Sequence, residues 1–318
     1  MPTPAPPFSS PLRRAEAHPT AEPVLLPARV AWQPLPTPRA YRALSYWEER
    51  SGRAVRRTTV ERTVRVTAAA QPTPWAVVLE ADPPVLHAPD PTALERALLL
   101  LAGVYQRLAL HLTPAGEVRG LLNHADVQRA WPAIRQAVVD RTGGEDPVTR
   151  VLLEAGDAGV AAPDRLLASL RHDYFYDALL GGNYQHYFEH GLRFSQPRRF
   201  CGFFDGAALW CHDHLTLAAP AAPGRVALRS RGGLDAARTD LPAVCRGIAD
   251  ARRLGGPPAG PTAPAQPAAP DPADVHAAFA ADYDLDATGW PVAVEWSVRC
   301  WVPEVYSKEY ALRLTLLP

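Results

Sequence analysis

The sequence of 318 residues has no surplus of charge, because its 33 basic residues balance its 33 acidic ones. Proteins that bind nucleic acid or an anionic membrane select an excess of Lys and Arg, so we predict neither partner. Lysine is nearly absent, since Lys308 is the only one and arginine carries the remaining positive charge. Arginine replaces lysine on a solvated surface at little cost, and this bias by itself indicates no function.

Cysteine and long apolar runs are also scarce. The four cysteines contain no C-x-x-C pair, which argues against a zinc ribbon and a thioredoxin-like motif. We expect buried free thiols in a reducing compartment. The longest apolar run, 97–104, is too short to cross a bilayer, and the N-terminus lacks the apolar segment of a secretory signal. The sequence therefore predicts a soluble, cytoplasmic protein without a transmembrane segment.

Motifs of the common enzyme classes are missing. The chain has no P-loop, no G-x-G-x-x-G fingerprint, no G-x-S-x-G elbow and no paired acidic motif. Each of these motifs places a phosphate, a nucleophile or an acid–base pair at a defined point of a fold, and their absence leaves no catalytic residue to predict.

Two segments rich in proline and alanine limit the folded part of the chain. Residues 1–24 cannot bury enough apolar surface to fold, and we predict a disordered tail. Residues 255–272 read GGPPAGPTAPAQPAAPDP and predict an extended surface loop. The C-terminal part beyond this loop is too small to stand alone, so we expect a single domain over residues 25–318.

Alternating apolar and polar residues near both ends of the chain predict β-strands. Val60, Val64 and Val66 alternate with polar residues, as do the apolar residues of 292–300 and 310–316. Two strands alone are marginal in water, so the C-terminal hairpin is expected to pair with N-terminal strands. No regular β-α-β alternation occurs. We predict an α+β fold, with a curved, mostly antiparallel sheet of N- and C-terminal strands and a helical middle region packed on it.

Local signals predict three further details. Ser51-Gly52 predicts a hairpin turn. Asp90 is expected to cap a helix over 91–106, with Leu94, Leu98, Leu101 and Tyr105 as its apolar stripe. A second helix is predicted over 163–180, which Gly181-Gly182 would end.

The segment from Tyr174 to His214 is the most suggestive part of the chain. Eleven of the 26 aromatic residues in the sequence lie between Tyr174 and Trp210, and four of the ten histidines lie in the whole segment. A strand over 207–217 would place Trp210, His212 and His214 on one face. Leu209, Cys211, Asp213 and Leu215 would lie on the other face. The simplest interpretation is an ordinary core, and the functional one is the wall of a pocket.

A histidine cluster in the same segment offers a metal site. His186 and His190 have the H-x-x-E-H spacing, with Glu189 as a general base. Together with His212 and His214 they could hold zinc. Inverted zinc peptidases need a further glutamate downstream, and none occurs between Glu189 and Glu295.

We therefore predict a non-enzymatic binding or interaction protein without a cofactor. Its ligand would be an apolar small molecule in an aromatic-lined pocket, and the candidate residues are Tyr184, Tyr187, Arg193 and Trp210. A protein partner, with the chain as a subunit of a larger assembly, is the other form of this prediction. The alternative is a metal-dependent hydrolase that uses zinc at the histidine cluster.

Overall fold

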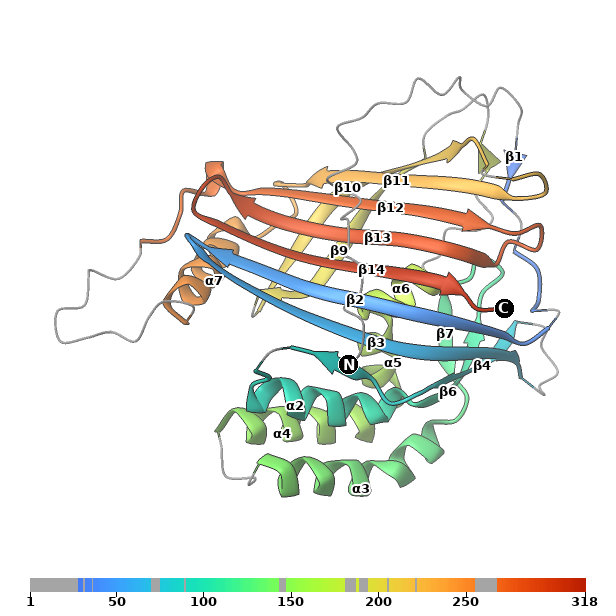
Figure 1. Ribbon diagram of the computed structural model, residues 1–318, viewed down its shortest axis with the longest axis horizontal. Coiled ribbons are helices and arrows are strands. Elements are labelled where there is room, and N and C mark those ends of the chain that lie inside the picture. The colour runs from blue at the N-terminus through green and yellow to red at the C-terminus, as the bar shows by residue number, and fades with distance from the viewer. Residues whose placement is uncertain are drawn as a thin grey trace, which may run out of the picture.

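Figure 1 shows the computed structural model of the chain. For residues 28, 29, 187, 188, 194 and 254 only the backbone is described. The described residues are 28–30, 32–35, 37–69, 75–88, 90–142, 147–180, 187–188, 194–204, 206–220, 222–254 and 268–318.

A 12-stranded antiparallel sheet dominates the fold, and it confirms the predicted α+β class (Figure 1). The two edge strands of the sheet, β7 and β9, are not neighbours in it, so the sheet stays open. A separate two-stranded ladder joins β1 (Ala28–Arg29) to β8 (Tyr187–Phe188). The strands of the large sheet are β2 (Arg39–Ser51), β3 (Ala54–Ala68), β4 (Ala76–Ala81), β5 (Val85–His87), β6 (Arg107–Leu112), β7 (Val118–Leu121), β9 (Phe194–Phe204), β10 (Ala207–Ala218), β11 (Val226–Leu234), β12 (His276–Leu285), β13 (Pro291–Val302) and β14 (Tyr306–Leu316).

The sheet is a meander whose first and last strands, β2 and β14, are neighbours at the centre of the strand order. From β2 the chain runs outward through β3, β4 and β6 to β7, and from β9 it runs back inward through β10, β11, β12 and β13 to β14. The first long strand and the last one then pair over their whole length, from Tyr41 opposite Leu316 to Ser51 opposite Tyr306. This pairing confirms that the C-terminal hairpin joins the N-terminal strands.

Helices interrupt the meander at three places along the chain: between β5 and β6, between β7 and β9, and between β11 and β12. They are α2 (Ala93–Leu101), α3 (His124–Thr142), α4 (Pro147–Ala161), α5 (Pro163–Arg171), α6 (Tyr174–Leu180) and α7 (Leu241–Leu254), with short 3-10 turns η1 (Ala102–Tyr105) and η2 (Pro272–Asp274). Helices α3 to α6 connect edge strand β7 to edge strand β9, so the chain must cross one face of the sheet. In that crossing α5 contacts β7, and α6 contacts the central strands β13 and β14.

The core lies between α6 and the sheet and is strongly aromatic. The ring of Tyr174 lies 5.2 Å from that of Trp296 and 4.8 Å from that of Tyr310. Phe200 and Phe279 extend the same cluster, with their ring centroids 5.2 Å apart. Every residue of α6 except Asp177 is buried. The first helix of the aromatic segment is therefore core, as the simplest interpretation of its composition expected.

The predicted N-cap at Asp90 is wrong, because Thr92 occupies that position. The Thr92 hydroxyl accepts a hydrogen bond from the Glu95 backbone N–H at 3.2 Å, and the Glu95 carboxylate accepts one from the Thr92 N–H at 2.8 Å. This capping box satisfies two N–H groups at once. The predicted apolar stripe is also wrong, because Ala97 faces the core, whereas Leu94 and Leu98 are 43% and 47% exposed.

The helix predicted over 163–180 is two helices, α5 and α6. The chain breaks at His172-Asp173, and the Asp173 carboxylate accepts a hydrogen bond from the Phe175 N–H at 2.8 Å. An aspartate at this position favours a new helix start over continuation. The predicted hairpin turn at Ser51-Gly52 is also shifted by one residue, because Ser51 pairs with Ala54 and leaves Gly52-Arg53 as the turn.

Two long strands, β9 and β12, were not predicted, and neither were the short strands β1, β5 and β8. Strand β9 contains Pro197 and Gly202, which are unfavourable in a strand interior, but β9 is an edge strand within the described residues, where proline is tolerated. Strand β12 reads HAAFAADYDL, and its alanines carry little strand propensity. Its place between β11 and β13 is set by the sheet around it.

The four cysteines are free, as predicted. Burial raises the pKa of the Cys211 and Cys300 thiols to about 12. Among the described residues, no helix is long and apolar enough to cross a membrane.

Candidate functional site

A cavity of about 550 Å³ lies between edge strand β7 and the α5–α6 region. This volume is within the range of small-molecule sites, about 300–1,000 Å³. The cavity is lined by Thr113, Glu117, Val118, Arg119, Leu170, Arg171, Tyr176, Asp177 and Leu180.

The cavity has an apolar floor and a charged rim. Val118, Leu170, Tyr176 and Leu180 are all buried, whereas Glu117, Arg119 and Arg171 are exposed. Arg171 also fixes the helix to the strand, because its Nε donates to the Val118 carbonyl oxygen at 3.0 Å. A floor of this kind suits an apolar group, and a rim with both signs of charge suits a polar one.

The α6 cap decides which side chains reach the cavity. Asp173 starts the helix, and Asp177 lies one turn later, with Tyr176 beside it. The rest of the helix is buried against the sheet, as the hydrogen bond from the Tyr174 hydroxyl to the Cys201 carbonyl oxygen at 2.5 Å illustrates. Asp177 is thus the one charged residue of α6, and it lies in the cavity wall.

A chain of buried ionic contacts runs from the cavity wall into the sheet. Arg198 Nη1 donates to Asp177 Oδ2 at 2.7 Å, and Arg198 Nε donates to Asp213 Oδ2 at 3.1 Å. The Ser230 hydroxyl donates to the other oxygen of Asp213. The guanidinium lies 4.8 Å from the centre of the Phe279 ring. These ionic contacts therefore link α6 to β9, β10 and β11 beneath the helix.

The inner end of this ionic chain, at Asp213, is well isolated from water. The Arg198 and Asp213 side chains are 7% and 0% exposed, and the Asp177 side chain is 23% exposed. Burial alone would lower the pKa of the Arg198 guanidinium, but Asp177, Tyr283 and Asp213 raise it above its usual value. Arg198 therefore stays charged. Buried ion pairs are weak evidence for stability, because desolvation offsets their attraction, and charged networks at a cavity are candidates for function.

The predicted ligand-binding residues are only partly described. Tyr184 and Arg193 lie outside the described residues, and Tyr187 is described only as a β8 backbone position opposite Arg29. Trp210 lies on the face of β10 turned away from α6, with the guanidinium groups of Arg199 and Arg238 each 5.8 Å from its ring. The structure does not place Trp210 in the cavity wall.

The histidine pair on β10 has the predicted orientation. Cys211, Asp213 and Leu215 are buried on the α6 side, so His212 and His214 face the other way. Their rings are 5.2 Å apart, and His212 Nε2 lies 2.7 Å from the Ser195 hydroxyl. His186 and His190 lie outside the described residues. Within the described ranges, no group of three or more His, Cys, Asp or Glu residues is arranged to hold a metal ion.

Sequence reasoning missed Asp177, Tyr176 and Arg198 as site residues. A usable signal was the single charge within the apolar helix sequence YFYDALL, because an isolated carboxylate on a buried helix needs a partner. Arg198 gave no such signal, because Arg199 beside it is the same residue and the sequence does not show which of the two is buried.

No known protein family matches the chain, and no curated protein shows significant sequence similarity to it.

Proposed function

We propose that this chain is a non-enzymatic binding protein that takes a small amphiphilic molecule into the cavity between β7 and α6. The observation that carries the proposal is the cavity of about 550 Å³ whose wall includes Asp177, the outer end of the buried ionic chain. An apolar portion of the ligand would lie on Leu170, Tyr176 and Leu180, and a polar group would lie at the rim.

The ionic chain supports a binding role more than a catalytic one. Asp177 and Asp213 both engage Arg198, so neither carboxylate is placed as a free acid or base. The ionic contacts of Arg198 fix the position of Asp177 and hence the shape of the cavity wall. A rigid, preformed wall lowers the cost of ordering on binding, and rigidity is what a binding site gains from such contacts.

The proposal is tested by blocking the cavity. Arg119→Trp places a large side chain at the rim and should lower the affinity for the amphiphilic dye 1-anilinonaphthalene-8-sulfonate by about tenfold or more, equal to roughly 1.4 kcal/mol. Dye fluorescence titration measures the affinity. Native mass spectrometry of each variant measures whether a small molecule retained during purification is lost.

The matched control is Arg107→Trp, a change on neighbouring strand β6 outside the cavity lining. Arg107 is 63% exposed and pairs with Glu80 on the surface. Dye affinity and retained mass should stay at the wild-type values in this variant. Equal dye affinity in both variants, with no retained molecule in the wild type, would make the proposed cavity function wrong.

The metal-dependent alternative stays a prediction, and the convergence of His212 and His214 on one face is the observation in its favour. Native mass spectrometry without chelator should then show an excess mass of one zinc ion in the wild type. The excess should disappear in both His186→Ala and His212→Ala. A wild-type mass without metal after zinc addition would remove this alternative.

A further inference from the structure

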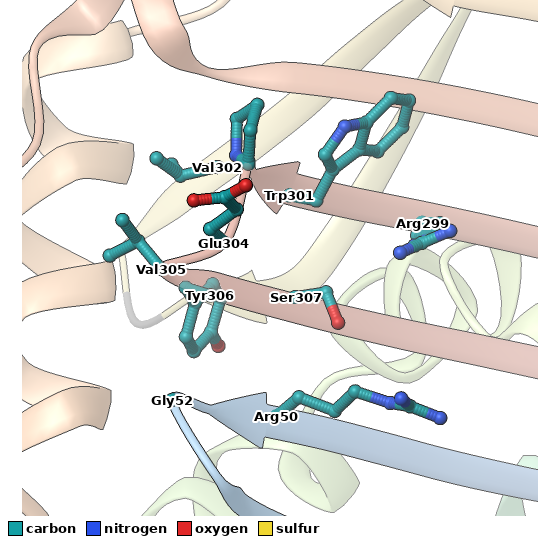
Figure 2. Close-up of a pocket in the computed structure, with 10 residues that line it drawn as sticks. Arg50, Gly52, Arg299, Trp301, Val302, Glu304, Val305, Tyr306 and Ser307 are labelled. Carbon is teal, nitrogen blue, oxygen red and sulfur yellow. The ribbon is translucent and has the colours of Figure 1, made fainter.

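A second hollow lies at the end of the sheet, beside the turn between β13 and β14 (Figure 2). It encloses about 260 Å³. Alternation along the strands places Arg50, Arg299, Trp301 and Ser307 on the face turned away from α6, because Trp47, Trp296 and Tyr310 face the helix. The hollow is thus separate from the β7–α6 cavity. Its lining residues are Arg50, Gly52, Arg299, Trp301, Val302, Pro303, Glu304, Val305, Tyr306 and Ser307.

Positive charge gathers at one end of this hollow. Trp301, Ser307 and Arg50 are direct neighbours on three adjacent strands, and Arg299 is the next residue of β13 on the same face. Arg50 Nε lies 2.7 Å from Glu48, but Glu48 also pairs with Arg57. One carboxylate therefore serves two guanidinium groups, and the Arg50 side chain remains 44% exposed.

The second cation is held in place by an aromatic stack. The Arg299 guanidinium lies 5.2 Å from the centre of the Trp301 ring, and that ring stacks on His276 with 5.4 Å between centroids. Glu309 lies opposite Arg299 in the strand register, where it accepts a hydrogen bond from the Tyr46 hydroxyl at 3.3 Å. Glu309 is not part of the lining. The stack restricts the Trp301 and Arg299 rotamers and so forms a preorganised wall.

The negative charge of Glu304 lies at the other end of the hollow, and the backbone of Glu304 has an unfavourable conformation. Val302 to Val305 form a tight turn, with the Val305 N–H donating to the Val302 carbonyl oxygen at 3.1 Å. Pro303 occupies the second position, and Glu304 the third with a φ of 60°. This is a type II turn, whose third position normally takes glycine or asparagine. A glutamate there costs folding free energy, and such strain motivates a search for a function.

The two ends of the hollow complement a molecule with two opposite charges. Figure 2 shows the Glu304 carboxylate at the turn and the Arg50 and Arg299 guanidinium groups farther along the strands, with Ser307 between these two. Guanidinium groups bind carboxylates and phosphates through paired hydrogen bonds. The glutamate supplies the acceptor that an ammonium group requires.

We propose that this hollow binds a small zwitterion of the amino-acid type. Arg50 and Arg299 hold its carboxylate, and Glu304 holds its ammonium group. An apolar side chain of the ligand packs against Trp301 and Pro303. The volume of about 260 Å³ is below the usual range for drug-sized ligands and suits a molecule of amino-acid size. The turn is also fixed from the neighbouring hairpin, because the Gly52 N–H donates to the Val305 carbonyl oxygen at 3.2 Å.

Isothermal titration calorimetry with three related probes tests the proposal. L-leucine carries both charges, 4-methylpentanoate lacks the ammonium group, and 3-methylbutylamine lacks the carboxylate. L-leucine should bind at least about tenfold more tightly than either of the other two, since each charge-assisted hydrogen bond contributes to affinity. A fourth probe, O-phosphoethanolamine, should bind more weakly than L-leucine.

The decisive variant is Glu304→Gln, which keeps the size of the side chain and removes its charge. L-leucine affinity should fall about tenfold to the level of 4-methylpentanoate, whose own affinity should not change. Glu154→Gln, an exposed glutamate of α4, is the matched control and should bind L-leucine like the wild type. Glu304→Gly should raise the Tm, because glycine relieves the strained turn, while it lowers L-leucine affinity as Glu304→Gln does.

Several results would overturn the zwitterion site. The first is the absence of any heat of binding with L-leucine at about 10 mM, a concentration at which millimolar affinities are visible. The second is an equal affinity of the wild type for L-leucine and 4-methylpentanoate. The third is undiminished binding of L-leucine by Glu304→Gln. Tighter binding of O-phosphoethanolamine would reject the carboxylate assignment in favour of a phosphate. Dye binding at the β7–α6 cavity should be unaffected throughout, so the two proposals fail separately.

Discussion

Replacement of Arg198 by methionine is expected to lower the free energy of unfolding by about 3–5 kcal/mol. Arg198 supplies the guanidinium that joins Asp177 to Asp213 in the buried ionic chain. Methionine has a similar length and fits the apolar surroundings, but it leaves the Asp213 carboxylate, 0% exposed, without its cation. An uncompensated buried charge carries the full cost of desolvation, and that cost is the source of the expected loss.

Arg199 offers a matched control one residue away. It is exposed on the opposite face of β9, where its guanidinium lies 5.8 Å from the Trp210 ring. Arg199→Met should change the free energy of unfolding by less than about 0.5 kcal/mol, as surface substitutions do. The double variant Arg198→Met, Asp213→Asn should be more stable than Arg198→Met alone, because no unpaired charge remains buried.

Urea unfolding of the four proteins, followed by circular dichroism, measures these differences. The midpoint of unfolding should fall for Arg198→Met and recover in part for the double variant. Equal losses in Arg198→Met and Arg199→Met would contradict the structural assignment of Arg198 as the buried member of the pair.

The second large effect is expected at Gly156 in α4. A Cβ atom at this position would lie 2.4 Å from Cη2 and 2.8 Å from Cζ2 of the Trp131 side chain. The indole cannot move aside freely, because its Nε1 donates to Asp157 at 2.7 Å and the side chain is buried. Gly156→Ala should therefore lower the free energy of unfolding by about 1–3 kcal/mol through overpacking, although alanine favours the helix.

Gly159 is the matched control, because it lies one turn later in the same helix and a Cβ atom there would meet nothing within 4 Å beyond its chain neighbours and the backbone of its own helix. Gly159→Ala should raise the free energy of unfolding by about 0.5–1 kcal/mol, since alanine has the higher helix propensity. Thermal unfolding by circular dichroism measures both variants, which should shift the Tm in opposite directions. A rise in Tm for Gly156→Ala would mean that Trp131 does not pack on this position.

Short-range pattern was a good guide to the strands at the two ends of the chain. Period-two alternation reports which face of a strand is buried, and it placed Cys211, Asp213 and Leu215 correctly on the buried face of β10. The same alternation could not reveal β12, because its alanines give no contrast between two faces. Nor could it identify the partner of a strand, which requires contacts across the whole sequence.

Helix ends were less well predicted, because several residues compete for the same role. Asp90 and Thr92 are both good N-caps, and the choice between them depends on the reciprocal hydrogen bond from Glu95. Asp173 starts a new helix within a segment whose composition also suits a continuous one. The face that a helix turns to the core is set by the elements packed against it, and here Leu94 and Leu98 point to solvent while Ala97 faces the core.

The sequence by itself determined the fold class, the two alternating terminal hairpins, the buried face of β10 and the free state of the thiols, because these depend on local composition and periodicity. Tertiary structure alone decided the rest. Neighbouring arginines 198 and 199 look alike in the sequence, yet one is buried between two carboxylates and the other is exposed. Their fates differ because β9 pairs with β10 in one register, and a register is set by the whole sheet. The cavity exists for a similar reason, since α5 contacts β7, and α6 adds its residues to the cavity wall, only when the chain crosses from one edge of the sheet to the other.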